Sequence, residues 1–279
     1  MKVGVIGSGT MGAGIAQLLA QHGHEVVLNA RRESSIERGI AGVDKQLGRA
    51  LQREKITQEQ KDETMARISG STVLEDLKDC DLIIEAAAEE IESKKELFKK
   101  LDELVGEEVI LATNTSSLSI TEIAAATNRP GKVVGMHFFN PVPVMKLVEV
   151  IGGVSTDDET LDYVTELSKE LGKNPVRVDE APGFVVNRIL VPLINEGVGI
   201  LADGVASAED IDAAMKLGAN HPMGPLELGD LIGLDVCLNI MDVLYTEFQD
   251  PKYRAHPLLR KMVRGGKLGR KTKAGFYNY

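Results

Sequence analysis

A glycine-rich turn near the start of the chain limits the possible folds more than any other feature of the sequence. The residues GSGTMG (7–12) follow a short apolar run, VGVIG (3–7), and open a helix-like stretch, MGAGIAQLLAQHG (11–23). In the spacing G-x-G-x-x-G, Gly7 permits a tight turn, Gly9 lets the backbone approach a pyrophosphate, and Gly12 allows helix and strand to pack closely. Together with Thr10 and Met11, these glycines are predicted to hold a dinucleotide at the positive end of the helix.

Strand-like and helix-like segments alternate through the first half of the chain. The strand-like runs are continuous and apolar, as is typical of parallel strands covered on both faces. They lie at 3–7, 25–28, 81–86, 108–114, 132–138, 146–153 and 176–178, and a polar, helix-prone insert (34–69) separates the second from the third. From Pro182 onward the segments are mostly helix-compatible. We therefore predict an α/β fold, with a Rossmann-type, doubly wound and mostly parallel sheet in residues 1–182 and an all-helical domain in residues 183–279.

Charge and cysteine content narrow the class of protein. The formal net charge is -10, which disfavours a general nucleic-acid binder or a membrane-surface binder. Cys80 and Cys237 lie far apart without a pairing pattern, which suits a reducing compartment and excludes a zinc site built on cysteines. No segment approaches the roughly 20 apolar residues of a membrane span. We expect a cytoplasmic protein with no bound metal.

The end of the second strand-like run bears on the choice of dinucleotide. An acidic residue at this point would bind the ribose 2′-OH of NAD, but the chain has Asn29, Ala30, Arg31 and Arg32. Ala30 removes the charge that would repel a 2′-phosphate, and the two guanidinium groups can bind one. We therefore predict that NADP(H) is preferred to NAD(H). In the alternative, both arginines face solvent and Asn29 alone binds the ribose of NAD.

Polar residues follow several of the predicted strands, where ligands bind in open parallel sheets. His137 lies at the end of the strand-like run 132–138, and histidine is suited to accept a hydroxyl proton near neutral pH as hydride leaves the substrate carbon. Glu149, on the next extended segment, is suited to fix the tautomer of His137 and to stabilise its imidazolium form. Taken singly, the alternatives are a histidine satisfied by backbone and a glutamate in a surface ion pair.

With these motifs the chain resembles the short-chain L-3-hydroxyacyl-CoA dehydrogenases, especially the bacterial branch that acts on 3-hydroxybutyryl-CoA. The resemblance covers essentially the whole chain. It is carried by GSGTMGAGIAQ (7–17), NTSSLSITEIA (114–124), GMHFFNPVPVMKLVEV (135–150), APGFVVNRIL (181–190), MKLGANHPMGPLELGDLIGLD (215–235) and LGRKTKAGFYNY (268–279). The resemblance implies that His137 is the catalytic base and Glu149 its partner. It also implies that Ser116 binds the substrate oxygen near the cofactor, and that Asn187 orients the substrate. The positions that match cofactor contacts of the family are Glu89, Lys94, Asn140 and Lys271.

The same resemblance implies the substrate and the assembly. The expected substrates are acetoacetyl-CoA and 3-hydroxybutyryl-CoA, in butyrate formation or fatty-acid metabolism, and the helical domain is expected to form a homodimer. The family binds the CoA phosphates near the insert, where Arg49, Arg53 and Lys55 supply positive charge, although a solvated helix face is the alternative for each. Two other functions stay open: a dehydrogenase of a free hydroxy acid or sugar acid, and a nucleotide-binding relative without turnover.

Overall fold

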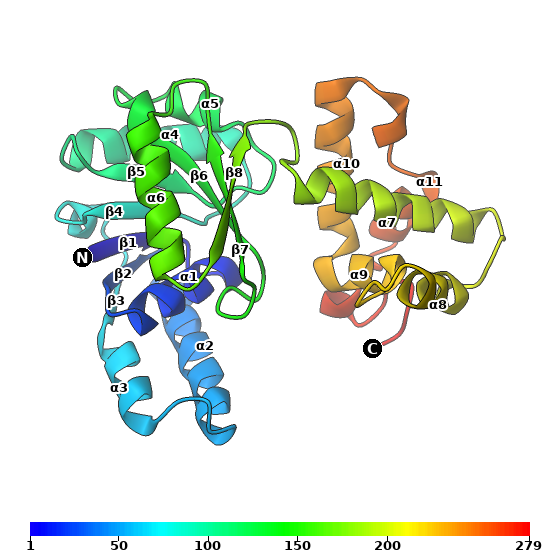
Figure 1. Ribbon diagram of the computed structural model, residues 1–279, viewed down its shortest axis with the longest axis horizontal. Coiled ribbons are helices and arrows are strands. Elements are labelled where there is room, and N and C mark those ends of the chain that lie inside the picture. Colours follow the sequence, from blue (N-terminus) through cyan, green and yellow to red (C-terminus); the bar gives the residue numbers. More distant parts are fainter. The chain divides into compact units, whose positions relative to one another are not determined.

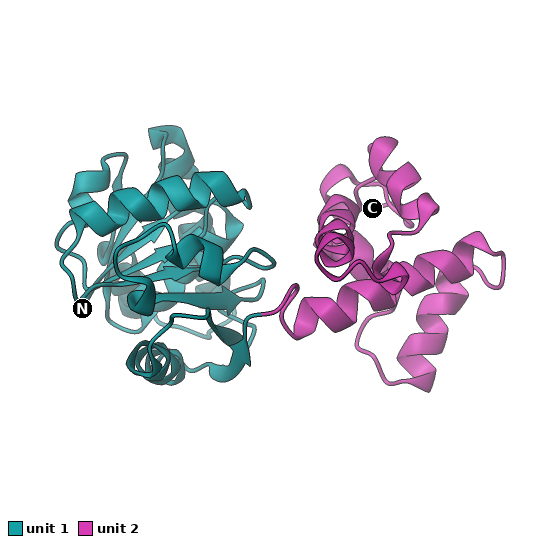
Figure 2. Cartoon of the chain, turned by 90° about the horizontal axis from the view of Figure 1, so that it is seen from above, with its two compact units in different colours: residues 1–180 teal, residues 181–279 magenta.

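The computed structural model of the chain describes residues 1–279 and divides into two compact units, Met1–Glu180 and Ala181–Tyr279 (Figure 2). None of its helices combines the length and the apolar character that a bilayer-spanning helix requires.

An eight-stranded sheet forms the centre of the first unit, in the order β3-β2-β1-β4-β5-β6-β7-β8 (Figure 1). The strands are β1 (Lys2–Ile6), β2 (Glu25–Asn29), β3 (Ile68–Ser71), β4 (Leu82–Glu85), β5 (Ile110–Thr113), β6 (Val133–Phe138), β7 (Leu147–Gly152) and β8 (Asn174–Asp179). β6 and β7 pair antiparallel, and the other neighbouring strands pair in parallel. The prediction of a Rossmann-type, mostly parallel sheet is confirmed.

The apolar runs that predicted the strands are the buried centre of this sheet. Every residue of β4, β5 and β6 is buried, as are four of the five residues of β1. Burial on both faces explains why these strands read as continuous apolar runs rather than as alternating ones. The helices that accompany the sheet are α1 (Thr10–Gln21), α2 (Glu33–Gln52), α3 (Gln58–Ala66), α4 (Ile91–Leu104), α5 (Ile120–Ala124) and α6 (Asp158–Glu170). Single turns of 3-10 helix occur at Leu74–Leu77 and Pro130–Lys132.

The region expected to be a helical insert contains a strand as well as helices. α2 and α3 form most of it, but the chain then enters β3, which pairs in parallel with β2 at one edge of the sheet. β3 has the sequence ISGS, and only its first residue is buried. Such a short and polar edge strand lacks the apolar pattern from which the other strands were predicted.

The glycine turn between β1 and α1 depends on two glycines for its shape. Gly7 has a φ of +105°, and a Cβ there would overlap the backbone of Ala86. A Cβ on Gly12 would overlap the carbonyl oxygen of Gly7, so α1 can begin this close to β1 only because Gly12 has no side chain. The amide of Gly7 donates to the carbonyl oxygen of Asn29, 2.8 Å away, which ties the turn to the end of β2.

The second unit is helical, as the sequence predicted. It consists of α7 (Val186–Ala202), α8 (Ala208–Gly218), α9 (Pro225–Ile232), α10 (Leu234–Phe248) and α11 (Pro257–Arg264), with 3-10 turns at Pro251–Tyr253 and Arg270–Thr272. Val191, Leu226 and Met241, from three of these helices, are fully buried in its core. The buried carboxylate of Asp230 accepts the backbone N–H groups of Phe276 at 3.0 Å and Tyr277 at 2.9 Å, so the carboxyl-terminal segment is bound to α9.

Candidate active site

The glycine turn faces open space where a pyrophosphate is expected. Gly9 is the N-cap of α1, and a Cβ built on it would meet nothing within 4 Å. A cavity of about 510 Å³ lies beside the turn, lined by Ser8, Gly9 and Thr10 on one side and by residues of α2 on the other. No carboxylate lines this cavity, whereas Arg38 of α2 does. The turn and its cavity therefore fit the phosphates of a dinucleotide.

Arg38 was not among the residues that sequence reasoning selected. Its Nε donates to the carbonyl oxygen of Ser34 at 3.0 Å, and a terminal guanidinium nitrogen donates to Ser35 Oγ at 3.2 Å. These bonds hold the guanidinium against the first turn of α2. The sequence carries no signal for this residue, because Ser35, Arg38, Gly42 and Gln46 line one cavity only once α2 packs beside the glycine turn.

The end of β2 carries the residues on which the choice of dinucleotide was argued. Asn29 is buried, and its Nδ2 donates to the carbonyl oxygen of Val73 at 3.0 Å. Arg31 and Arg32 are exposed, and Arg32 is the N-cap of α2. The first acidic residue after β2 is Glu33, which begins α2 and is also exposed. Two cations therefore lie between the end of β2 and the nearest carboxylate along the chain.

His137 and Glu149 form a buried pair on the two antiparallel strands. The register of β6 and β7 places the two residues directly opposite each other, so their side chains project from the same face of the sheet. His137 Nδ1 lies 2.7 Å from Glu149 Oε2, and the side chains are 8% and 1% exposed. Because a carboxylate only accepts, Nδ1 carries the proton of this bond, and Nε2 is then the nitrogen that can exchange a proton with a ligand.

Glu89, Lys94 and Ser116 are brought together at the ends of β4 and β5. Glu89 Oε1 accepts the amide of Ser116 at 2.8 Å and the Ser116 hydroxyl at 3.3 Å. Lys94 Nζ, from the first turns of α4, lies 3.5 Å from Glu89 Oε2. The hydroxyl of Thr115 donates to Glu89 Oε1 at 2.5 Å and accepts the amide of Leu118 at 3.0 Å. Glu89 thus fixes the backbone turn that carries Ser116.

Ser116 does not cap α5, the helix that follows it. The N-cap of α5 is Ser119, whose hydroxyl accepts the amide of Glu122 at 3.0 Å. Ser116 therefore lies before the cap and is not needed for it.

The remaining predicted site residues lie in three other places. Asn140 is exposed and lies two residues after the end of β6. Asn187 lies in the first turn of α7, in the second unit. Lys271 also belongs to the second unit, where its Nζ lies 2.5 Å from a carboxylate oxygen of Asp235.

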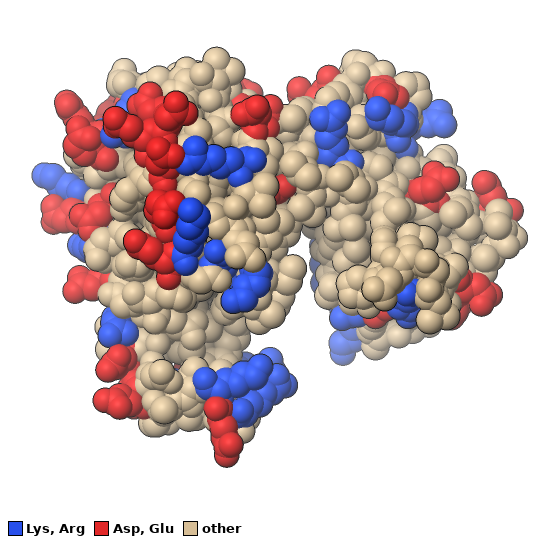
Figure 3. Space-filling model, in the orientation of Figure 1, with Lys and Arg blue, Asp and Glu red and all other residues tan.

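The residues proposed for the CoA phosphates lie at the far end of α2. Arg49 is in the last turn of α2, Arg53 is its C-cap, Lys55 follows, and all three are exposed. Figure 3 shows basic side chains gathered over this end of α2 and α3. The positive charge needed for a phosphate is present there.

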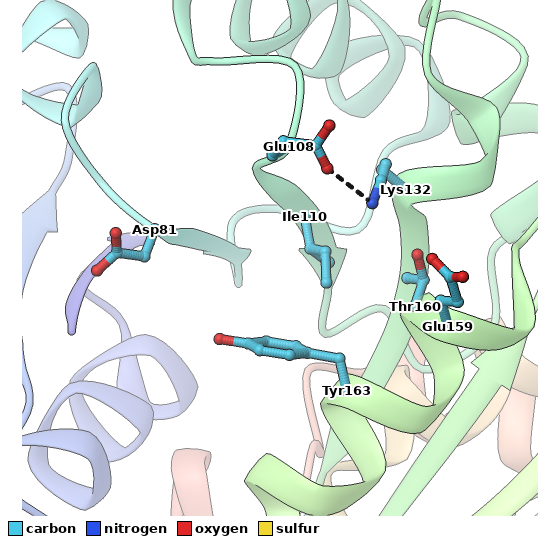
Figure 4. Close-up of a pocket in the computed structure, with 7 residues that line it drawn as sticks. All are labelled: Asp81, Glu108, Ile110, Lys132, Glu159, Thr160 and Tyr163. Atoms are coloured by element: carbon cyan, nitrogen blue, oxygen red, sulfur yellow. Dashed lines mark hydrogen bonds and ion pairs between the residues drawn. The ribbon is translucent and has the colours of Figure 1, made fainter.

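A second hollow, of about 310 Å³, lies at the opposite edge of the sheet, where β4 and β5 begin (Figure 4). Asp81, Glu108 and Glu159 line it, and its single lysine, Lys132, is paired with Glu108 at 3.2 Å. Three carboxylates around one paired cation are unsuited to a phosphate ligand. The nucleotide chemistry therefore belongs to the edge that carries the glycine turn.

Comparison with known families matches both units. The sequence model described as "3-hydroxyacyl-CoA dehydrogenase, NAD binding domain" matches residues 2–181, and that described as "3-hydroxyacyl-CoA dehydrogenase, C-terminal domain" matches residues 183–279. The chain belongs to the 3-hydroxyacyl-CoA dehydrogenase family. The resemblance inferred from the motifs is thereby confirmed, and family membership makes the chain an NAD(P)-dependent oxidoreductase.

Relatives of this dehydrogenase family cover the whole chain. The 3-hydroxybutyryl-CoA dehydrogenase of Clostridioides difficile is 64% identical over 279 residues, which is 100% of this chain and 99% of the relative. The mitochondrial hydroxyacyl-coenzyme A dehydrogenase of Homo sapiens is 45% identical, over 99% of this chain and 90% of the relative. The crystal structure of (S)-3-hydroxybutyryl-CoA dehydrogenase from Ralstonia eutropha is 54% identical, covers 100% of this chain and 98% of its own, and has a TM-score of 0.95.

Proposed function

We propose that the chain is a (3S)-3-hydroxybutyryl-CoA dehydrogenase, which interconverts 3-hydroxybutyryl-CoA and acetoacetyl-CoA with a nicotinamide cofactor. The observation that carries this proposal is the buried His137–Glu149 pair, with Nδ1 and Oε2 2.7 Å apart. His137 is on β6, which pairs with β5, the strand that leads into the segment of Ser116. A protein that only binds nucleotides has no need of a buried acid–base pair of this kind. The substrate named for the relatives from Clostridioides difficile and Ralstonia eutropha supports a four-carbon acyl group.

The pair accounts for the proton that accompanies the redox step. The nicotinamide, when bound, supplies or accepts the hydride at C3 of the acyl group. In oxidation, His137 Nε2 takes the hydroxyl proton, and the imidazolium that forms is stabilised by the carboxylate of Glu149. In reduction, the protonated His137 returns this proton to the forming alkoxide. Burial of both side chains keeps water from competing for this proton.

Other residues hold the reactants in this proposal. The glycine turn (Gly7, Gly9, Thr10, Met11 and Gly12) binds the pyrophosphate, as the open space in front of Gly9 supports. By the family resemblance, Ser116 and Asn187 position the substrate, and the cofactor contacts are Glu89, Lys94, Asn140 and Lys271. Arg49, Arg53 and Lys55 attract the CoA phosphates through their exposed charges at the end of α2.

We further propose that NADP(H) is preferred to NAD(H). Ala30 brings no carboxylate to the end of β2, and the exposed Arg31 and Arg32 can bind a 2′-phosphate. A hydrogen bond to a charged group contributes about 1.5–3 kcal/mol, so one good contact gives roughly tenfold preference or more.

We also propose an assembly and a cellular location for the chain. The helical second unit forms a homodimer, as the family resemblance implies. The chain acts in the cytoplasm, which the two unpaired, buried cysteines support.

One experiment tests both the reaction and the cofactor. The value of kcat/KM for acetoacetyl-CoA reduction is measured with NADPH and with NADH at the same salt and pH. We expect at least tenfold preference for NADPH, and we expect Arg31→Ala combined with Arg32→Ala to remove most of it. Lys45→Ala, which removes an exposed cation from α2, the helix that Arg32 caps, should keep the preference for NADPH. A preference for NADH would refute the cofactor proposal, and absence of turnover with either cofactor would refute the reaction.

A further inference from the structure

A lysine and a glutamate form an ion pair in the interior of the first unit. Lys94 is 2% exposed and Glu85 is fully buried. Lys94 Nζ lies 2.6 Å from Glu85 Oε1 and 2.7 Å from Oε2, so it contacts both oxygens of the carboxylate. Burying two charges costs several kcal/mol per ion unless the geometry satisfies them, so such a pair at the ligand-binding edge of a sheet calls for a reason.

Glu85 is held by donors from three neighbouring segments. It is the last residue of β4, and the register of the sheet places it beside Thr113, the last residue of β5. The Thr113 hydroxyl donates to Glu85 Oε2 at 2.7 Å, and the amide of Ala87 donates to Oε1 at 2.6 Å. Together with Lys94, these donors fix both oxygens. Glu85 therefore cannot turn without breaking bonds to β5, to α4 and to its own loop.

The same lysine links this fixed carboxylate to the candidate active site. The carboxylates within 4 Å of Lys94 Nζ are those of Glu85 and Glu89. Glu89, in turn, accepts the amide and the hydroxyl of Ser116 through Oε1. A continuous series of charge-assisted contacts thus runs from Glu85 through Lys94 and Glu89 to Ser116.

We propose that Glu85 is a positioning residue for the cofactor and substrate contacts at this edge of the sheet. This inference rests on the proposed function, in which Lys94 and Glu89 contact the cofactor and Ser116 contacts the substrate. With Glu85 ionised, the charge of Lys94 is neutralised inside the protein, and Glu89 keeps Oε1 for Ser116. Without that charge, Glu89 is the only carboxylate within 4 Å of a buried ammonium group, and it turns toward Lys94 and away from Ser116.

The test removes the negative charge of Glu85 while keeping the shape of its side chain. In Glu85→Gln, the dissociation constants of NADPH and NADH, measured by fluorescence titration without substrate, are expected to rise at least tenfold. We also expect kcat for acetoacetyl-CoA reduction to fall at least tenfold. Glu85→Asp keeps the charge but draws the carboxylate back by one methylene group from Lys94 and Thr113, so both losses should be measurable, between twofold and tenfold, and smaller than in Glu85→Gln.

A second buried ion pair of the same unit supplies the control. Asp102 accepts Arg129 Nε at 2.6 Å, and its side chain is 4% exposed, but its side-chain partners, Asn128 and Arg129, do not belong to the candidate site. Asp102→Asn should lower the melting temperature while leaving the cofactor dissociation constants and kcat within twofold of wild type. The comparison separates loss of a buried charge from loss of positioning.

Three outcomes decide the matter. If Glu85→Gln behaves like Asp102→Asn, with a lower melting temperature but unchanged cofactor affinity and kcat, Glu85 is only structural and the proposal is wrong. If Glu85→Gln does not fold, the same comparison is made with Glu85→Asp, where unchanged affinity and kcat overturn the proposal and weakened ones support it. If wild type does not reduce acetoacetyl-CoA, the proposed function fails separately, and cofactor affinity still tests Glu85.

Discussion

Replacement of Glu149 by glutamine examines the proposed proton chemistry most directly. The change removes one negative charge from a side chain that is 1% exposed and 2.7 Å from His137 Nδ1, with almost no change in shape. A glutamine oxygen can still accept the Nδ1–H bond, so the imidazole can keep its orientation. What is lost is the charge that faces the imidazolium.

The size of the effect follows from this geometry. Opposite unit charges about 4 Å apart interact by about 4 kcal/mol at an effective dielectric constant of about 20. The neutral hydrogen bond that glutamine retains contributes about 1 kcal/mol, which leaves a loss of about 3 kcal/mol. At about 1.4 kcal/mol for each factor of ten, Glu149→Gln should lower the rate of a step that forms imidazolium by roughly a hundredfold.

The assay is the oxidation of (3S)-3-hydroxybutyryl-CoA, because the imidazolium forms in that direction. The value of kcat/KM is measured from the absorbance of the reduced cofactor, beside a thermal melt that confirms folding. Glu107→Gln removes the same charge from an exposed position and serves as the control. A folded Glu149→Gln enzyme with kcat/KM within threefold of wild type would show that the carboxylate does not stabilise the imidazolium, and the proposed pairing would be refuted.

Two further predictions concern the turn and acid stability. In Gly12→Ala, the new methyl group would collide with the Gly7 carbonyl oxygen. The change should therefore weaken cofactor binding in a fluorescence titration and lower the melting temperature by an amount equivalent to about 1–3 kcal/mol. Wild-type affinity for the cofactor would contradict this prediction. Burial raises the pKa of Asp102, but hydrogen bonds from Asn128 and Arg129 outweigh it and hold the pKa below its ordinary value of 3.8. A lowered folded-state pKa means that this carboxylate contributes its full stability above the unfolded pKa and loses it as the pH falls through the folded pKa. The difference in melting temperature between wild type and Asp102→Asn should therefore shrink as the pH falls below 3.8, and a constant difference would contradict the argument.

The glycine turn and the parallel strands could be predicted because their causes are local. A strand buried on both faces must be apolar throughout, and Gly7 and Gly12 stand where a side chain would overlap the backbone. β3 lacked such a signal, since three of its four residues are not buried and it depends on pairing with β2. The pattern thus predicted the centre of the sheet better than its edge.

The candidate site was predictable only in part, for a related reason. His137 could be selected because it lies at the end of an apolar run, and Ser116 because its segment matches a motif of the family. Glu85 ends such a run as well, in DLIIEA, but a single acid at a strand end gives no sign of the lysine that will neutralise it. That partner comes from α4, and the pairing depends on how the helix packs against the sheet. Arg38 was missed likewise, because its cavity exists only after α2 packs beside the glycine turn.

The order of the strands explains why these residues meet. β1, β2, β4, β5 and β6 run in parallel, so their carboxyl ends fall along one edge of the sheet and bring the glycine turn, Glu85 and the Ser116 segment together. His137 lies near the same end of β6. The chain then reverses, and because β7 is antiparallel, the beginning of β7 lies beside the end of β6. A parallel strand in that position would have carried Glu149 away from this edge, whereas the reversal places its carboxylate beside His137 Nδ1 on one face of the sheet. The single antiparallel pairing is thus what gives the histidine its buried carboxylate.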